Sequence, residues 1–200
     1  MRQQIVVMRM ENTRNRITPH FIYNALSHEM LAQMNGHQVK LGPLTQLIRR
    51  GVDQAGELKT TLKEELTFVD YYVGIEAQQM GQDFQYVKEI APDVDMEAVR
   101  LPAMTIQIFV ENAIKHGLRR QGGLLTVRAT RQGDATLVEV TDNGQGLSPQ
   151  YHENTGLLVV RQTILMLNEQ NQQQITFGVD NLEQGCRSWL ILPDDYDYNL

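Results

Sequence analysis

The segment ENAIKHG, residues 111–117, carries four polar side chains whose types suit phosphate and metal chemistry: Glu111, Asn112, Lys115 and His116. Their spacing of i, i+1, i+4 and i+5 places them on one side of a helix. An amide oxygen is a hard ligand that suits Mg²⁺. A lysine with a histidine nearby suits phosphate. The alternative is a solvated polar face near a helix C-terminus, where Lys and His complement the helix dipole.

A second candidate is VEVTDNGQGL, in which a strand-like run ends at Asp142 and is followed by Gly144 and Gly146. Glycines let the backbone pass close to a ligand, and exposed N–H groups in such a turn can hold phosphate. A carboxylate at the end of a strand can accept a hydrogen bond from an exocyclic amine such as that of adenine. The alternative is an ordinary Asp-Asn-Gly hairpin turn.

A third candidate is ENTGLLVVRQTI, in which Gly156 lies just before a predicted helix. Backbone N–H groups and the helix dipole favour an anion at such a position. The polar stretch 147–155 that precedes it is a candidate for a mobile lid. An ordinary loop that leads into a helix is the alternative.

The stretch ITPHFIYNAL, residues 17–26, sets His20 and Asn24 one helical turn apart. Thr18 can serve as an N-cap and Pro19 as the first helical residue, where the missing N–H of proline costs nothing. The apolar side chains of the stretch fall on another face of that helix. A continuous helix that is kinked at the proline is the alternative.

The elements that must position these residues differ between the two halves of the chain. Residues 1–80 show helical periodicity, including a stripe within 44–52 and a Thr61–Glu64 capping-box pattern. Residues 81–200 show five strand-like runs, with a hairpin turn predicted at Gly133–Asp134, and helices predicted over 102–117 and 156–170. This pattern predicts an α+β chain: a helical region over 1–80 and an α/β sandwich over 81–200, with one helical layer on one sheet.

Composition narrows the class of protein. The 200 residues are 42% apolar and 21% charged, which is typical of a globular chain. A net charge of −6 argues against general nucleic-acid binding, and a single cysteine excludes an internal disulfide. No apolar run approaches the length of about 18 to 20 residues that a bilayer span needs.

Taken together, an amide-bearing helix, an Asp-x-Gly-x-Gly turn and a Gly-Leu helix start resemble the GHKL or Bergerat ATP-binding domain. LPAMTIQIFVENAIKHGL resembles the N-box of one branch of that fold, the LytS-type sensor histidine kinases. ITPHFIYNAL resembles the Asn-Pro-His-Phe-x-x-Asn motif of the same branch, and the later helical segments also fit. The resemblance spans residues 10–193 approximately.

The resemblance implies that His20 accepts the γ-phosphoryl group of ATP, with Asn24 orienting the ring or a water molecule. It implies that Asn112 holds Mg²⁺, with Lys115 and His116 near the phosphates. Glu111 is then expected to support the water shell of the metal or to act on a water molecule.

For the adenine ring, the resemblance implies that Asp142 accepts a hydrogen bond from the exocyclic amine. It also implies that Gly144 and Gly146 let the backbone come close to the nucleotide. Gly156 and Leu157 are expected to close the nucleotide site. ATP and Mg²⁺ are the expected cofactors.

The resemblance also implies a homodimer formed through the helical region, and phosphotransfer to an aspartate of a response regulator in a two-component system. We expect the chain to be the cytoplasmic portion of a membrane sensor whose input region precedes it. Three positions depart from the family pattern: Thr18, Asn154 and Val159. Because two of them lie at or near the lid, a degenerate kinase that acts as a binding module is one alternative. A GHKL ATPase that uses Glu111 as a base is the other.

Overall fold

The structure is a computed structural model that describes residues 57–78, 80, 82–118, 122–147 and 155–198. The predictions for His20, Asn24 and the stripe within 44–52 therefore lie outside the described residues. The same holds for 148–154, which make up most of the lid predicted over 147–155.

A five-stranded sheet forms one layer, with the strand order β2-β4-β5-β7-β6. Strands β2 and β4 are parallel, and the other neighbouring pairs are antiparallel. The predicted hairpin at Gly133–Asp134 is confirmed, because β4 and β5 pair up to Gln132 and Ala135. The strands are β2 (Phe84–Ile90), β4 (Gly123–Gln132), β5 (Ala135–Asp142), β6 (Thr176–Asn181) and β7 (Cys186–Pro193).

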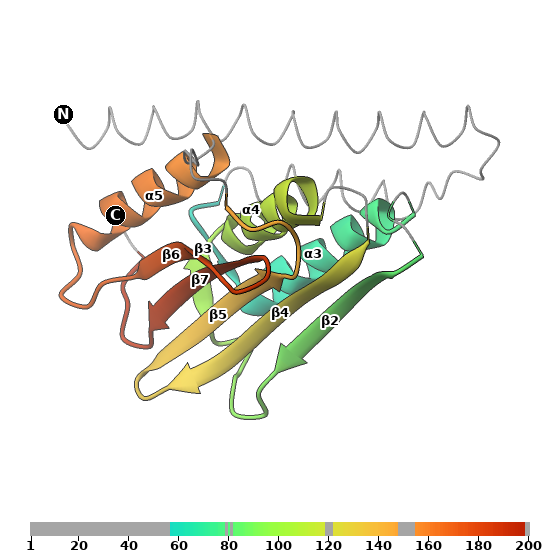
Figure 1. The fold of residues 1–200 in the computed structure, drawn as a ribbon. Helices are drawn as coiled ribbons and strands as arrows, with labels where there is room; N and C mark the ends of the chain where they lie inside the picture. Colours follow the sequence, from blue (N-terminus) through green and yellow to red (C-terminus); the bar gives the residue numbers. More distant parts are fainter. Residues whose placement is uncertain (1–56, 79, 81, 119–121, 148–154, 199–200) are drawn as a thin grey trace.

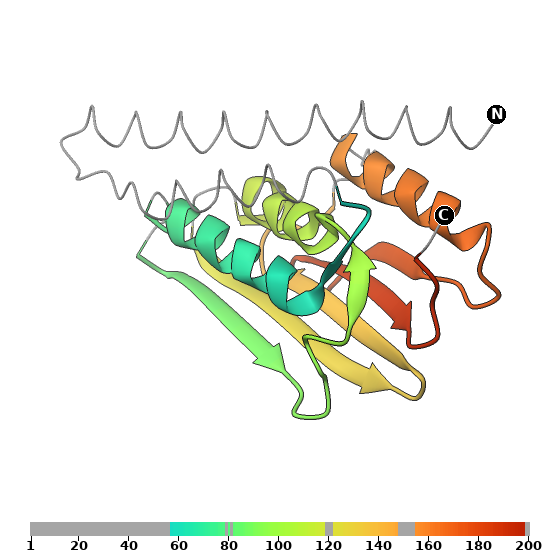
Figure 2. The ribbon, with the colours of Figure 1, turned by 180° about the vertical axis from the view of Figure 1, so that it is seen from behind.

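Helices cover one face of this sheet, as Figure 1 and the reverse view in Figure 2 both show. They are α3 (Leu62–Glu76), α4 (Thr105–Asn112), a π-helical turn η1 (Ala113–Leu118) and α5 (Thr155–Asn168). The predicted sandwich of one helical layer on one sheet is confirmed. Alternation along the strands explains it, since Leu125, Val127 and Ala129 of β4 are all fully buried while Arg128 between them is exposed.

A separate two-stranded ribbon leads into two of the helices. Strand β1 (Lys59–Thr61) runs directly into α3 and pairs antiparallel with β3 (Arg100–Pro102), which comes shortly before α4. The helix predicted from residue 102 therefore begins only at Thr105, because 100–102 are extended and paired. The predicted position of Gly156, just before a helix, also needs correction. Helix α5 begins at Thr155, so Gly156 lies within its first turn.

One hydrophobic core joins the helices and the sheet. Fully buried members come from α3 (Leu62 and Val69), α4 (Phe109), β4 (Leu125) and β7 (Leu190). Helix α3, which precedes the boundary predicted near residue 80, thus packs in the same core as the sheet. Burial of such side chains contributes about 1.5–3 kcal/mol each relative to exposure, so this core binds α3 firmly.

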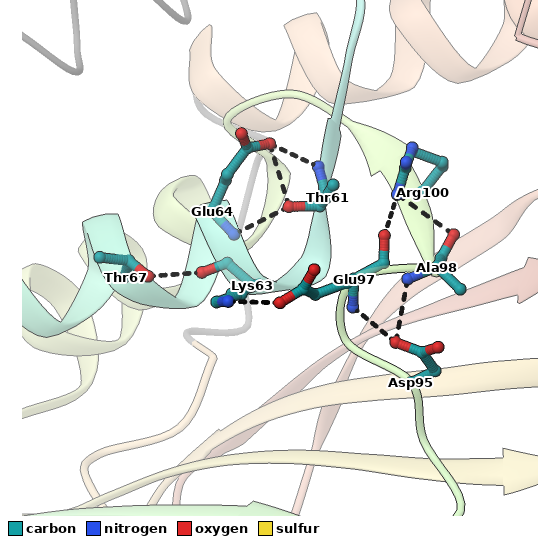
Figure 3. A network of polar contacts seen from close by, with 8 residues as sticks. All are labelled: Thr61, Lys63, Glu64, Thr67, Asp95, Glu97, Ala98 and Arg100. Atoms are coloured by element: carbon teal, nitrogen blue, oxygen red, sulfur yellow. Dashed lines mark hydrogen bonds and ion pairs between the residues drawn. The ribbon is translucent and has the colours of Figure 1, made fainter.

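The start of α3 is fixed by polar contacts, which Figure 3 shows. The predicted capping box is confirmed: Thr61 Oγ1 accepts a hydrogen bond from the Glu64 N–H at 3.1 Å, and Glu64 Oε2 accepts one from the Thr61 N–H at 3.0 Å. Lys63 forms an ion pair with Glu97 in the loop before β3. The Leu62 and Lys63 N–H groups also donate hydrogen bonds to the carbonyl oxygens of Val99 and Met96, so the later part of that loop is tied to the first turn of α3.

Candidate functional site

The C-terminal end of α4 carries the first set of predicted residues. Glu111 and Asn112 are half-buried at the end of α4, while Lys115 and His116 are exposed in η1. Lys115 forms an ion pair with Glu111, as an i, i+4 spacing allows. The π-helical turn was not predicted, although such turns occur often at functional sites because they change the direction of side chains within a helix.

Asp142 ends β5 and is only 5% exposed. Its Oδ1 accepts a hydrogen bond from the Gly144 N–H at 2.9 Å. Burial raises the pKa of the carboxyl group above its ordinary value, and backbone hydrogen bonds from Gly144 and Cys186 partly oppose that rise. A buried carboxylate held by backbone donors is a preformed acceptor for a ligand N–H group.

The end of η1 and the turn after β5 touch through two contacts that need glycine and one backbone hydrogen bond. A Cβ on Gly117 would lie 2.4 Å from Oδ1 of Asp142, and a Cβ on Gly144 would lie 2.1 Å from the Gly117 carbonyl oxygen. That carbonyl oxygen accepts a hydrogen bond from the Gln145 N–H at 3.3 Å. The structure therefore brings Asp142 and Gly144 against the segment that carries Lys115 and His116.

Gly117 is a site residue that the sequence analysis missed. Its position at the end of a predicted helix is typical of an ordinary C-terminal cap, and no local signal distinguishes that role from contact with Asp142. The contact joins residues 25 positions apart, so only the packed structure reveals it.

The turn from Asn143 to Leu147 is held by two asparagines that the sequence analysis also missed. Asn143 Oδ1 accepts a hydrogen bond from the Leu124 N–H at 2.7 Å, and Asn181 Oδ1 accepts one from the Leu147 N–H at 2.6 Å. Gly146 has φ of 73°, a left-handed conformation that favours glycine. The turn is thus anchored to strands on both sides of β5.

Gly156 and Leu157, the two residues predicted to close the nucleotide site, lie at the start of α5 and differ in their exposure. Gly156 is half-exposed, whereas the Leu157 side chain is 1% exposed and belongs to the core. A small pocket between α4 and α5 is lined by Thr105 and Ile108 on one side and by Val159 and Thr163 on the other. This mostly apolar pocket does not include Asp142, so it is not the predicted adenine site.

The residues present fit a nucleotide with a divalent cation. Glu111 and Asn112 supply oxygen atoms near the basic pair Lys115 and His116 in sequence, and the buried Asp142 carboxylate lies against Gly117, which follows His116 directly. Mg²⁺ often takes only one or two protein ligands and completes its shell with phosphates and water. Within the described ranges, no group of three or more His, Cys, Asp or Glu side chains could hold a metal ion by itself.

None of the helices in the described part of the chain is both long enough and apolar enough to cross a membrane.

Two family models match the chain in succession. The model of the histidine kinase family matches residues 8–84, and the model described as histidine kinase-, DNA gyrase B- and HSP90-like ATPase matches residues 98–195.

Two relatives with similar sequences carry the names of sensor proteins. The sensor protein LytS of Streptococcus mutans is 26% identical over 194 residues, which cover 90% of this chain and 33% of that protein. The sensor histidine kinase YpdA of Escherichia coli is 24% identical over 190 residues, which cover 90% of this chain and 33% of that protein. The chain thus spans about a third of the length of these relatives.

Solved structures share the fold. The histidine kinase domain of the blue-light activated histidine kinase from Erythrobacter litoralis EL346 superposes with a TM-score of 0.55 at 14% identity, covering 93% of each chain. The histidine kinase AdeS of Acinetobacter baumannii has a TM-score of 0.50 at 15% identity, covering 90% of this chain and 96% of that chain.

Proposed function

The chain belongs to the LytS-type histidine kinases, and from that premise we propose that it transfers the γ-phosphoryl group of ATP to His20. A neutral imidazole is a competent nucleophile near pH 7, because one ring nitrogen carries a free lone pair. Asn24, one helical turn later in the sequence, would orient the ring or a water molecule.

The observation that carries the proposal is the Asp142 carboxylate, which is buried and held against Gly117 and Gly144. Because the carboxylate is buried, few water molecules can reach it. The hydrogen bond that it accepts from the Gly144 N–H fixes the orientation of the carboxylate. We propose that it accepts a hydrogen bond from the exocyclic amine of adenine. Gly144 and Gly146 would let the backbone approach the base, and Gly156 with the backbone of Leu157 would close the site.

The phosphate end of the nucleotide would lie at the end of α4. Asn112 would hold Mg²⁺ through its amide oxygen, and Lys115 and His116 would bind the phosphates. When bound, Mg²⁺ neutralises charge on the phosphates. Lys115 would have to leave its ion pair with Glu111 to reach a phosphate, and the carboxylate that is set free could then support the water shell of the metal. Phosphoryl transfer needs mainly such positioning and charge neutralisation.

We further propose that the phosphoryl group passes from His20 to an aspartate of a response regulator. The chain would act as a homodimer through its helical region. His20 and the nucleotide belong to different matched regions, so they would meet either within one chain or across the dimer. Since the similar proteins are sensor kinases and the chain spans a third of their length, we propose that it is the cytoplasmic transmitter portion of a membrane sensor.

The test is incubation with γ-labelled ATP and Mg²⁺, comparing the native chain with His20→Ala and with His28→Ala as a matched control. We expect acid-labile, base-stable label on the native chain and on the control, and none on His20→Ala. Label that persists in His20→Ala would overturn the assignment of the acceptor.

Two further results would each favour one of the alternatives. Phosphate release without labelled protein, unchanged in His20→Ala, would favour a GHKL ATPase. A nucleotide that raises Tm in a chain that takes no label, even after forced dimerisation, would favour a binding module.

A further inference from the structure

Helix α3 carries a buried polar stripe along one face. Glu65, Tyr72 and Glu76 are 0%, 3% and 6% exposed. Their spacing of i, i+7 and i+11 places all three on the same side of the helix. Carboxyl groups are rarely buried unless they are paired, so these residues need partners within the fold.

The partner of Glu65 is the start of α4. Its carboxylate accepts hydrogen bonds from the N–H groups of Met104, Ile106 at 3.1 Å and Gln107 at 3.4 Å. These are donors that the first turn of a helix cannot satisfy internally, and the negative charge lies at the positive end of the helix dipole. Met104, the N-cap residue, has φ of 68° and carries only a weakly accepting thioether. The cap of α4 therefore comes from α3.

The same stripe reaches the other end of α4. Burial raises the pKa of Tyr72 well above its ordinary value, and the negative charges of Glu76 and Glu111 raise it further. Two turns of α3 separate Glu65, which binds the start of α4, from Tyr72, whose pKa responds to the charge of Glu111 near the end of α4.

The N-terminal turn of helix α3, just before Glu65, is held in place by polar contacts. The Thr61–Glu64 capping box and the Lys63–Glu97 ion pair hold the first turn, as Figure 3 shows. The loop before β3, which contains Glu97, is held by further hydrogen bonds. The Asp95 carboxylate accepts from the N–H groups of Glu97 and Ala98, and the Arg100 guanidinium donates to the Ala98 carbonyl oxygen. The helical turn that precedes Glu65 is therefore fixed to the loop before β3.

We infer that Glu65 is a positioning residue, which fixes α4 to α3 and thereby sets the position of Asn112 and Lys115 at the opposite end of α4. The inference rests on the proposed function for the identity of the ligand. Its consequence is that a displacement of α3, the last helix of the matched histidine kinase region, changes nucleotide affinity through α4.

The test is equilibrium binding of Mg-ATP to the native chain, to Glu65→Gln and to Val69→Ala. Val69 is also fully buried on α3 and makes no polar contact with α4, so its truncation is a control for lost stability. The measurement is made at a temperature at which circular dichroism shows all three chains to be folded. We expect Glu65→Gln to bind about tenfold more weakly, a typical size for coupling between two sites, while Val69→Ala binds as the native chain does.

Equal affinity of Glu65→Gln and the native chain would overturn the inference and leave the proposed function intact. An equal loss in Val69→Ala would also overturn it, because a general disturbance of the packing of α3, and not the hydrogen bonds of Glu65, would then explain the effect. No nucleotide binding by the native chain would overturn the proposed function, and the inference with it.

If Glu65→Gln does not fold, amide hydrogen exchange in the native chain provides the test. Coupling works in both directions, so Mg-ATP must slow exchange at the Ile106 and Gln107 amides. The amides of Glu97 and Ala98, which Asp95 caps, should not respond and are the internal control. Unchanged exchange at Ile106 and Gln107 would overturn the inference.

Discussion

The Asp142 carboxylate packs directly on the Cα of Gly117, where a Cβ would lie 2.4 Å from Oδ1 and 2.8 Å from Oδ2. This contact joins the end of the α4–η1 segment, which carries the predicted phosphate-binding side chains, to the predicted adenine acceptor. A side chain at residue 117 must displace either the carboxylate or the helix.

Gly117→Ala is expected to abolish detectable nucleotide binding and to lower the free energy of unfolding by about 1–3 kcal/mol, the usual cost of overpacking. Isothermal titration with Mg-ATP and urea denaturation measure the two effects. The control is Gly74→Ala on α3, where a Cβ meets nothing within 4 Å. It should stabilise the chain by about 0.5–1 kcal/mol and leave binding unchanged. Native affinity in Gly117→Ala would show that the contact is not part of the nucleotide site.

Asp142→Asn is expected to remove adenine nucleotide binding while raising Tm at neutral pH. Because the folded pKa of Asp142 lies above its unfolded value, its charged form is disfavoured in the folded chain. Its contribution is therefore most favourable below the unfolded pKa, and it declines as the pH rises through the folded pKa. The neutral amide can still accept the Gly144 hydrogen bond.

Thermal melts of Asp142→Asn and the native chain from pH 3 to pH 8 test this sign. The gain in Tm should be present at pH 7 and disappear toward pH 3, where the native carboxyl group is also neutral. A Tm loss at pH 7 would contradict the prediction.

Cys186 provides a chemical probe of the same position. Burial and the neighbouring Asp142 charge raise the pKa of its thiol to about 11. Because only the thiolate reacts, alkylation by iodoacetamide should be slow at pH 8 and should accelerate with a midpoint near that value. Asp142→Asn should shift the midpoint to lower pH. The chain has one cysteine, so the total label reports this site alone. An unshifted midpoint in Asp142→Asn would show that the carboxylate does not act on the thiol.

Gln107 on α4 is a candidate for stabilisation. Its side chain is 1% exposed, and neither its amide nitrogen nor its amide oxygen has a hydrogen-bond partner within the part of the chain that the structure describes. Because a buried unsatisfied polar group costs about 1–3 kcal/mol, Gln107→Met should raise the free energy of unfolding by about 1–2 kcal/mol. Urea denaturation measures it. The exposed Gln162 on α5 is the matched control, and Gln162→Met should change stability by less than about 0.5 kcal/mol. Destabilisation by Gln107→Met would show that the amide is satisfied in solution.

Features encoded within a few residues could be predicted from the sequence. Alternation of apolar and polar residues predicted the five strands of the sheet, and Gly133–Asp134 predicted the hairpin. The Thr61–Glu64 pair predicted the start of α3. These predictions succeed because turns, caps and periodicity depend on neighbours along the chain. Motif resemblance similarly indicated the family. The roles of His20 and of the site residues remain proposals that the experiments above test.

Contacts between distant segments were decided only by the tertiary structure. The pairing of β3 with β1 delays the start of α4. Glu65, which no sequence motif singled out, caps that helix by accepting a hydrogen bond from Met104, 39 residues away. Gly117 meets Asp142 only after the sheet brings β5 beneath η1. Such contacts depend on strand register and core packing, which no short stretch of sequence contains, and they position the groups that the motifs supply.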